Sequence, residues 1–218
     1  LLGKTNTLYI PRIIMTGEAG GSSFILLEYI EGGNPISGFF KTFGKSLAGL
    51  HRNTNEKFGL DHNNYIGLLP QSNKQHTDWT GFFIEERILP QMRLANFSGQ
   101  RAKRLDTLFK KLEEIFPPEK PALLHGDLWN GNYIISPTGT ACIFDPAVYY
   151  GNREMDTAMT KLFGGFDKEF YEAYHYEFPL EPGWKERTDI CNLYPLLVHV
   201  NLFGGSYMNQ MDSIINRF

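Results

Sequence analysis

One short polar run carries the residues best suited to chemistry. Its sequence is His125-Gly126-Asp127-Leu128-Trp129-Asn130-Gly131-Asn132. Phosphoryl transfer needs a carboxylate close to the attacking hydroxyl group and oxygen ligands for the magnesium ion that neutralises the phosphates. Asp127 can accept the hydroxyl proton, while Asn132 and the later Asp145 can offer amide and carboxylate oxygens to the metal. The run therefore predicts phosphoryl transfer from ATP with Mg²⁺ as cofactor.

The chain between Asn132 and Asp145 explains how these two residues can meet. Apolar residues occupy 133–135 and 141–144, and the turn sequence Ser136-Pro137-Thr138-Gly139 separates them. A tight hairpin of this kind returns Asp145 to the side of Asn132. A single Asp or Asn is more often a turn or capping residue than a catalytic one. The joint pattern, however, favours catalysis.

Neighbouring residues narrow the class of kinase. We expect the imidazole of His125 to bond to the loop backbone rather than to act as a base. Gly126 stands where protein kinases carry an arginine that pairs with a phosphorylated loop. Asp145 is followed by Pro146-Ala147 rather than by Phe-Gly. These differences disfavour regulated protein phosphorylation and favour a small-molecule substrate.

Upstream of the run, the pattern changes from strands to a helix. Apolar residues in 8–14 and 22–30 predict two strands, joined by a glycine-rich turn over 16–21. This turn lacks the spacing of a phosphate-binding loop, so we interpret it as a hairpin turn. Helical spacing of apolar residues predicts a helix over 39–50, with Ser37 as its candidate cap.

The remaining chain is mainly helical in pattern. Residues 52–74 are polar and predict a long loop. Helical spacing predicts helices over 79–89, with a break or kink at Pro90, and over 100–116. A short apolar stretch then precedes the polar run. The segments beyond Gly151 with helical spacing are 153–163, 168–176, 184–203 and 207–218.

Composition limits the partners. The 218 residues carry a formal net charge of -3, with a pI near 6.1, so no broad basic surface for nucleic acid is expected. The apolar runs are too short to span a membrane, and none resembles a signal peptide. The chain has only two cysteines, Cys142 and Cys191. They are too few for a disulfide framework, and they do not have the spacing of a zinc site. We expect a cytoplasmic protein whose partners are neither nucleic acid nor membrane.

Several motifs together resemble the fructosamine kinase (ketosamine-3-kinase) family, within the aminoglycoside phosphotransferase and protein-kinase-like group. The polar run followed by Asp145 is typical of the wider group. Leu128-Trp129 and the segment Phe163-Gly164-Gly165-Phe166 narrow the resemblance to the family. Residues 63–73 and 193–205 also look like family segments, so the resemblance covers nearly the whole chain.

The resemblance implies an α+β, protein-kinase-like fold of the aminoglycoside phosphotransferase type, with a remnant of the N-lobe sheet and a mainly helical C-lobe. Residues 1–30 would form a partial N-lobe with a hairpin and the hinge strand, and residues 31–218 the helical C-lobe with the catalytic loop. The family's nucleotide-covering loop, strand lysine and helix glutamate are not identifiable, and Leu1 begins in mid-pattern. We therefore expect part of the N-lobe to lie upstream of Leu1.

The same resemblance assigns roles to individual residues. Asp127 would be the catalytic base, and Asn132 and Asp145 would hold Mg²⁺. Family members phosphorylate the 3-hydroxyl of sugars attached to amines, which are early glycation adducts, and the product then decomposes to release the amine. The hinge whose backbone meets the adenine of ATP would be Glu28, Tyr29 and Ile30.

Other residues of the resemblance point to the sugar. Trp129 could stack on a sugar face, although core packing explains it equally well. His199 and Asn201 could reach the same pocket, although a satisfied core histidine is at least as good an interpretation of the first. The expected partner is a small sugar amine, or a glycated amino acid or protein lysine.

Other functions remain open at this point. The site would also suit a kinase of another small alcohol, such as an aminoglycoside or choline. The chain could instead be a non-catalytic, nucleotide-binding pseudokinase, although a site without activity need not keep Asp127, Asn132 and Asp145 together. A hydrolase that removes the sugar directly would need a nucleophile paired with a base, and no such pair is evident.

Overall fold

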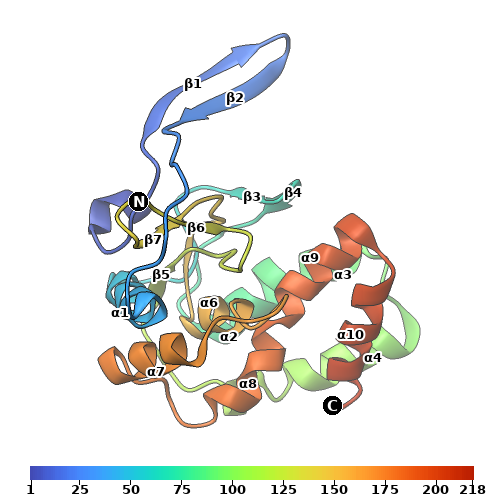
Figure 1. Ribbon diagram of the computed structural model, residues 1–218. Helices are drawn as coiled ribbons and strands as arrows, with labels where there is room; N and C mark the ends of the chain where they lie inside the picture. Colours follow the sequence, from blue (N-terminus) through green and yellow to red (C-terminus); the bar gives the residue numbers. More distant parts are fainter.

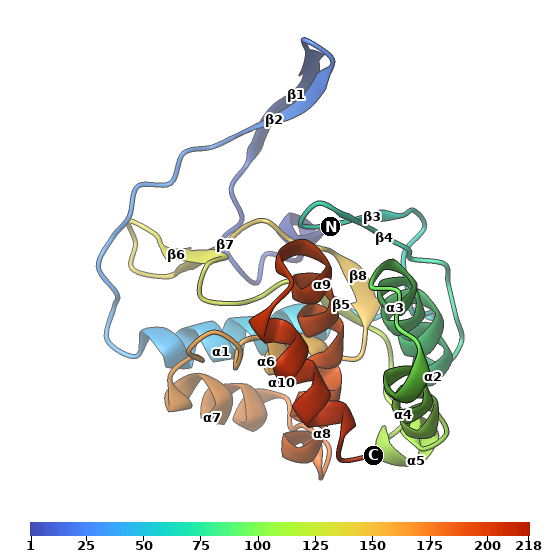
Figure 2. The ribbon, with the colours of Figure 1, turned by 90° about the vertical axis from the view of Figure 1, so that its right-hand side faces the viewer.

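The computed structural model describes residues 1–218. A long two-stranded hairpin projects from a mainly helical body, and a second view shows it standing clear of the helices (Figures 1 and 2). Its strands, β1 (Ile13–Ala19) and β2 (Ser22–Leu27), pair antiparallel and follow a short 3-10 helix, η1 (Leu2–Thr5). The chain is therefore mixed α and β, with helices dominating the body.

The bounds of this hairpin differ from the predicted ones. The turn lies at Gly20-Gly21, whose φ angles of 59° and 79° are both in the left-handed region, rather than over 16–21. Glycine adopts this conformation without strain, and such two-residue turns match the twist of the strands. Of the strand predicted over 8–14, only Ile13 and Ile14 are in β1, and Tyr9 makes an isolated bridge to Cys142. The strand predicted over 22–30 ends at Leu27. Because most hairpin side chains are exposed, apolar patterning does not locate the strand ends.

Helix α1 (Phe39–His51) confirms the helix predicted over 39–50 and packs along α7 (Lys168–Glu177). Its N-cap is Gly38, with a φ of 69° and no side-chain cap, so the prediction of Ser37 as cap is wrong. The two helices approach closely at Gly44. A Cβ atom there would lie 2.2 Å from the carbonyl oxygen of Phe170, so only glycine permits this contact.

The segment predicted as a long loop contains a second, short antiparallel hairpin of β3 (Asn64–Ile66) and β4 (Leu69–Gln71). A continuous helical rod follows, built from α2 (Trp79–Phe82), the π-helix η2 (Phe83–Ile88) and α3 (Leu89–Leu94). Pro90 does not break this rod. The N–H of Leu89 bonds to the carbonyl of Ile84, five residues earlier, so the π-turn accommodates the residue that lacks a donor.

Four short strands frame the polar run: β5 (Ala122–Leu124), β6 (Tyr133–Ile135), β7 (Ala141–Ile143) and β8 (Tyr149–Gly151). The β6–β7 pair confirms the predicted hairpin, whereas the pairing of β5 with β8 was not predicted. The other helices are α4 (Gly99–Phe109), α5 (Leu112–Ile115), α6 (Glu154–Met159), α8 (Trp184–Cys191), α9 (Leu193–Phe203) and α10 (Ser206–Ile215). The helices predicted over 100–116 and 184–203 are thus each divided in two. None of the helices combines the length and apolar character needed to cross a membrane.

Two apolar clusters meet at β5. Ala122 and Leu124 belong to the larger cluster, which includes residues of η2, α4 and α9, whereas Leu123 belongs to the smaller one, with α1 and α7. Successive side chains of a strand point to opposite faces, so β5 is packed from both sides and all three of its residues are buried. The polar run therefore starts from a rigid point.

Candidate active site

The polar run forms a loop that Asp156 of α6 holds from beneath. One carboxylate oxygen of Asp156 accepts the backbone N–H of His125 at 2.7 Å, and the other accepts that of Gly126 at 2.9 Å. Gly126 has a φ of 84°, and a Cβ atom there would lie 2.1 Å from the carbonyl oxygen of Ala147. The backbone conformation and the close contact thus require glycine at this position. The arginine that protein kinases carry there would not fit.

His125 has the structural role predicted for it. Its Nε2 donates to the carbonyl of Phe144 at 3.0 Å, and its Nδ1 accepts the backbone N–H of Asp127 at 3.3 Å. The ring is fully buried, and burial lowers its pKa, so the imidazole is neutral. It ties the start of the loop to the end of the β6–β7 hairpin.

Asp127 and Asn132 are in direct contact across the loop. The side-chain nitrogen of Asn132 donates to the carbonyl oxygen of Asp127 at 2.8 Å and to its carboxylate at 3.0 Å. These bonds use the amide hydrogens, so the side-chain oxygen of Asn132 is the atom left for a cation. Burial is the main influence on Asp127 and raises its pKa from 3.8 to about 6, because the bond from Asn132 offsets only part of the cost.

The hairpin returns Asp145 to the same place. The N–H of Phe144, the residue before Asp145, bonds to the backbone carbonyl of Asn132 at 3.1 Å. Asp145 itself has a φ of 51°, a left-handed conformation that Asp tolerates better than most residues. Asp127, Asn132 and Asp145 line one cavity of about 540 Å³. The structure therefore brings together the predicted base and both predicted metal ligands.

The predicted sugar-binding residues divide into two groups. Trp129 and His199 line the same cavity. Both pack against Phe163, with ring centroids 5.4 Å and 4.8 Å from its ring. Asn201 does not line the cavity, because its side-chain amide donates to Gln91 of α3 and links α9 to that helix. The lining gives no support to its predicted contact with the sugar, which stays a prediction.

The predicted hinge lies at the base of the projecting hairpin, outside the cavity lining. The carboxylate of Glu28 accepts the backbone N–H of Arg12 at 3.1 Å and the hydroxyl of Tyr9 at 3.2 Å. The backbone N–H of Glu28 also bonds to the carbonyl of Arg12 at 2.8 Å, directly beyond the end of β2 at Leu27. Tyr29 is 87% exposed. The structure does not bring this segment into contact with Asp127, and its adenine-binding role stays a prediction.

The β3–β4 hairpin forms part of the wall of the cavity. Gln71 donates to the carbonyl of Ala147 at 3.1 Å, and Asn64 donates to that of Val148 at 2.8 Å. The hydroxyl of Tyr194 on α9 donates to the side-chain oxygen of Gln71 at 2.7 Å. These bonds fix the hairpin to the chain that follows Asp145.

Asp156 is the residue that sequence reasoning missed. It is fully buried, and its carboxylate lies 3.1 Å from Nε2 of His51, whose Nδ1 contacts the hydroxyl of Tyr174 at 2.7 Å. The network therefore joins the catalytic loop to α1 and α7. The sequence carries only a weak signal, since Asn152, Arg153 and Thr160 near it are polar too, whereas the requirement that a buried Asp be paired follows only from its burial in the structure.

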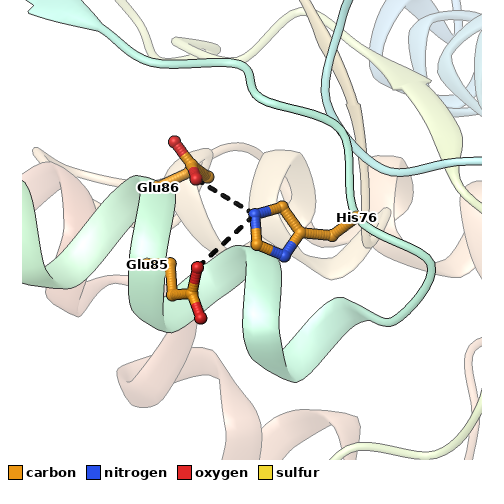
Figure 3. A group of neighbouring side chains, drawn as sticks. All are labelled: His76, Glu85 and Glu86. Atoms are coloured by element: carbon orange, nitrogen blue, oxygen red, sulfur yellow. Dashed lines mark hydrogen bonds and ion pairs between the residues drawn. The ribbon is translucent and has the colours of Figure 1, made fainter.

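A second group of ionisable residues lies away from the cavity, where His76 points between Glu85 and Glu86 of η2 (Figure 3). Nε2 of His76 is 3.0 Å from Glu86 and 3.9 Å from Glu85. Ser72 donates to the second oxygen of Glu86. Burial opposes ionisation of Glu86, but these partners hold its pKa below the ordinary value. Since both oxygens of Glu86 have protein partners, we assign the group to stabilising the π-turn.

The fold and the site define a phosphotransferase of the protein-kinase-like fold. A crystal structure of an aminoglycoside phosphotransferase covers 97% of this chain and 77% of its own, with a TM-score of 0.61 and 15% identity, which establishes the shared fold alone. A crystal structure of a candidate fructosamine-3-kinase from Haemophilus somnus is much more similar. Its TM-score is 0.90 at 32% identity, over 99% of this chain and 75% of that chain.

The family follows from the sequence comparison. The fructosamine kinase family model matches residues 1–218, and the chain belongs to this family. It is 43% identical over 224 residues to a probable ketoamine kinase of Vibrio parahaemolyticus, a match that covers 100% of this chain and 76% of that protein. The predicted fold class, the family resemblance and the prediction of an ATP-dependent kinase acting on a hydroxyl group are thereby confirmed.

Proposed function

We propose that the cavity binds a ketosamine with its sugar 3-hydroxyl at Asp127, and that the protein transfers the γ-phosphoryl group of ATP to that hydroxyl. The observation that carries the proposal is the convergence of Asp127, Asn132 and Asp145 on one cavity. The 3-position is supported by the relative from Haemophilus somnus, whose name is that of a 3-kinase. The product would be a sugar phosphate on an amine, as expected of a deglycation enzyme.

Asp127 acts on the substrate directly in this proposal. Its carboxylate accepts the proton of the hydroxyl as the oxygen attacks the phosphorus, and the bond from Asn132 holds that carboxylate toward the cavity. His125 keeps the loop in place without exchanging a proton, since both of its ring nitrogens bond to the backbone. The protein mainly supplies position and charge, as phosphoryl transfer requires.

Asn132 and Asp145 are the residues that would hold Mg²⁺. The free amide oxygen of Asn132 and the carboxylate of Asp145 are hard oxygen donors, which is the chemistry that Mg²⁺ prefers. They lie on the same cavity as Asp127. When bound, the ion would neutralise phosphate charge. The donor set therefore fits the cofactor that the kinase family implies.

The nucleotide side of the proposal rests on the first 30 residues. They would belong to a partial N-lobe, in which Glu28, Tyr29 and Ile30 form the hinge that meets adenine, and 31–218 would form the C-lobe. Support comes from the hairpin, which projects from the body (Figure 1), and from the ketoamine kinase of Vibrio parahaemolyticus, of which this chain covers 76%. The free, buried thiols of Cys142 and Cys191 suit a reducing cytoplasm as the place of action.

The test is ATP turnover with a synthetic fructosamine, such as the adduct of a short capped lysine peptide. Asp127→Asn should lower kcat by about 10²–10⁴-fold, because a general base is removed while the amide keeps the size of the side chain. Asp106→Asn, an exposed residue of α4, is the matched control and should keep parental activity. Full activity of Asp127→Asn would exclude the assigned base.

A substrate panel separates the neighbouring functions. The same assay with an aminoglycoside and with choline should give much lower kcat/KM values than the fructosamine. A clear preference for either alcohol would overturn the ketosamine proposal. Magnesium-dependent ATP binding without turnover of any of the three would instead identify a pseudokinase.

A further inference from the structure

Asp127 acts on the sugar, so it does not decide which amine the sugar is attached to. The residues that line the cavity limit which chemical groups this amine can carry. Fifteen residues line the cavity, and none of them is Lys or Arg. Its acidic side chains are Asp127 and Asp145. Nδ1 of His199, the one imidazole present, is occupied by the carbonyl of Pro195 at 2.7 Å. A carboxylate on the substrate would therefore have no lysine or arginine of the lining to pair with.

The rim of the cavity has an apolar character. Three of its large side chains are exposed to solvent, namely Tyr65 by 65%, Leu68 by 86% and Phe203 by 67%. Tyr65 is in β3, Leu68 is in the β3–β4 turn, and Phe203 is the last residue of α9. Large apolar groups that gather in the open around one cavity mark a binding surface. An apolar part of the ligand would remove them from water.

The rim is preformed. Gln71 and Asn64 fasten the base of the β3–β4 hairpin to the backbone beyond Asp145. At the turn, a Cβ atom on Gly67 would lie 3.3 Å from the side chain of Leu202, so the hairpin tip rests against α9. The exposed side chains of the hairpin and of α9 thus belong to the lining of the same cavity as Asp127.

Within the proposed function, on which this step rests, we infer that the protein selects ketosamines whose amine carries an uncharged, apolar group. Adducts of free α-amino acids are disfavoured. In a ketosamine, three covalent bonds separate the amine nitrogen from the carbon that bears the 3-hydroxyl. A carboxylate on the next carbon would thus stay within ~10 Å of the carboxylate of Asp127, which holds no metal in the proposed function, and like charges at this distance repel. The protonated amine itself suits these carboxylates and the aromatic faces.

A matched pair of substrates tests the inference. Fructosyl-glycine and fructosyl-glycinamide have the same sugar and nearly the same size, and they differ in one negative charge. We expect kcat/KM for the amide to exceed that for the acid by about tenfold or more. Equal values, or a preference for the acid, overturn the inference and leave the proposed function standing. Turnover of neither substrate, nor of the lysine peptide adduct, overturns the proposed function and the inference with it.

A pair of variants locates the discrimination. Leu68→Lys places a cation on the rim and should reduce the amide-to-acid ratio at least about threefold, mainly by raising kcat/KM for fructosyl-glycine. Leu94→Lys adds the same charge at an exposed position of α3 that does not line the cavity, and it should keep the parental ratio. An unchanged ratio in Leu68→Lys, or an equal drop in Leu94→Lys, overturns the placement of the amine group at this rim.

Discussion

The two sides of the catalytic loop carry aspartate carboxyl groups in opposite electrostatic states. On the cavity side, burial is the main influence on Asp127 and raises its pKa to about 6. Beneath the loop, Asp156 is more deeply buried, yet its pKa lies below the ordinary value. Burial disfavours both anions, but Asp156 accepts bonds from two backbone N–H groups and lies against His51, whereas Asn132 is the donor to the carboxylate of Asp127. The number of donors therefore decides the sign.

This difference in pKa suits the two aspartates to different roles, Asp156 to holding the loop in place and Asp127 to accepting a proton. A carboxylate whose partners favour its ionised form can organise a loop but is a poor proton acceptor. A carboxylate with few partners is costly to ionise and can gain from accepting a proton. The catalytic loop has one of each, and substitutions on its two sides should have different consequences.

The largest effect on stability is expected beneath the loop. Asp156→Asn should lower the free energy of unfolding by about 3–5 kcal/mol, because it removes a buried charge and turns an amide hydrogen toward backbone donors. Urea denaturation measures the change, with the exposed Asp106→Asn as control. A loss below about 1 kcal/mol would show that the contrast between the two sides is not electrostatic.

On the cavity side, replacing the aspartate should stabilise the protein instead of destabilising it. Asp127 in the folded protein has a pKa of about 6, above the ordinary 3.8, so its stabilising contribution is complete below pH 4 and is lost as the pH rises through 6. Asp127→Asn should therefore raise the free energy of unfolding by about 1–3 kcal/mol at pH 8 and have little effect at pH 4. Denaturation in magnesium-free buffer at both values checks this. A destabilised variant at pH 8 would contradict it.

A smaller effect on stability is expected at Gly131, on the cavity side of the loop, where a substitution should change substrate use more than folding. A Cβ atom there would lie 2.4 Å from the ring of Trp129, so Gly131→Ala must displace that ring. We expect kcat/KM for the fructosamine to fall by about tenfold, with a change of less than about 1 kcal/mol in unfolding free energy. Gly3→Ala, which meets no atom within 4 Å, serves as control. If Gly131→Ala kept the parental kcat/KM, Trp129 would not be part of the substrate site.

The smallest effect is expected far from the loop, on the projecting hairpin. Ile25 is 54% exposed and belongs to a strand pair whose side chains pack little. Ile25→Thr keeps the β-branched shape and should change the unfolding free energy by less than about 0.5 kcal/mol. Thermal denaturation measures it against Leu124→Ala, a fully buried change in β5 that should cost about 2–5 kcal/mol. Similar losses in both variants would contradict this comparison.

The elements that the sequence predicted well are those whose own residues decide their structure. Helix α1 follows its apolar periodicity, and the β6–β7 hairpin follows its turn residues. The elements that it missed depend on partners distant in the chain. Strand β8 pairs with β5, and the π-turn at Pro90 is supported by His76 from outside the helix. Such elements have weak local signals because tertiary contacts stabilise them.

For the site, the sequence by itself determined which polar residues meet. The spacing of Asp127, Asn132 and Asp145 brings the predicted base and the predicted metal ligands to one cavity through a local hairpin, so short-range geometry was sufficient. Tertiary structure alone placed Asp156 beneath the loop, moved Asn201 away from the cavity and set the β3–β4 hairpin as its wall. Burial and hydrogen-bond partners from distant segments decide these positions, and neither quantity can be read from the spacing of residues along the chain.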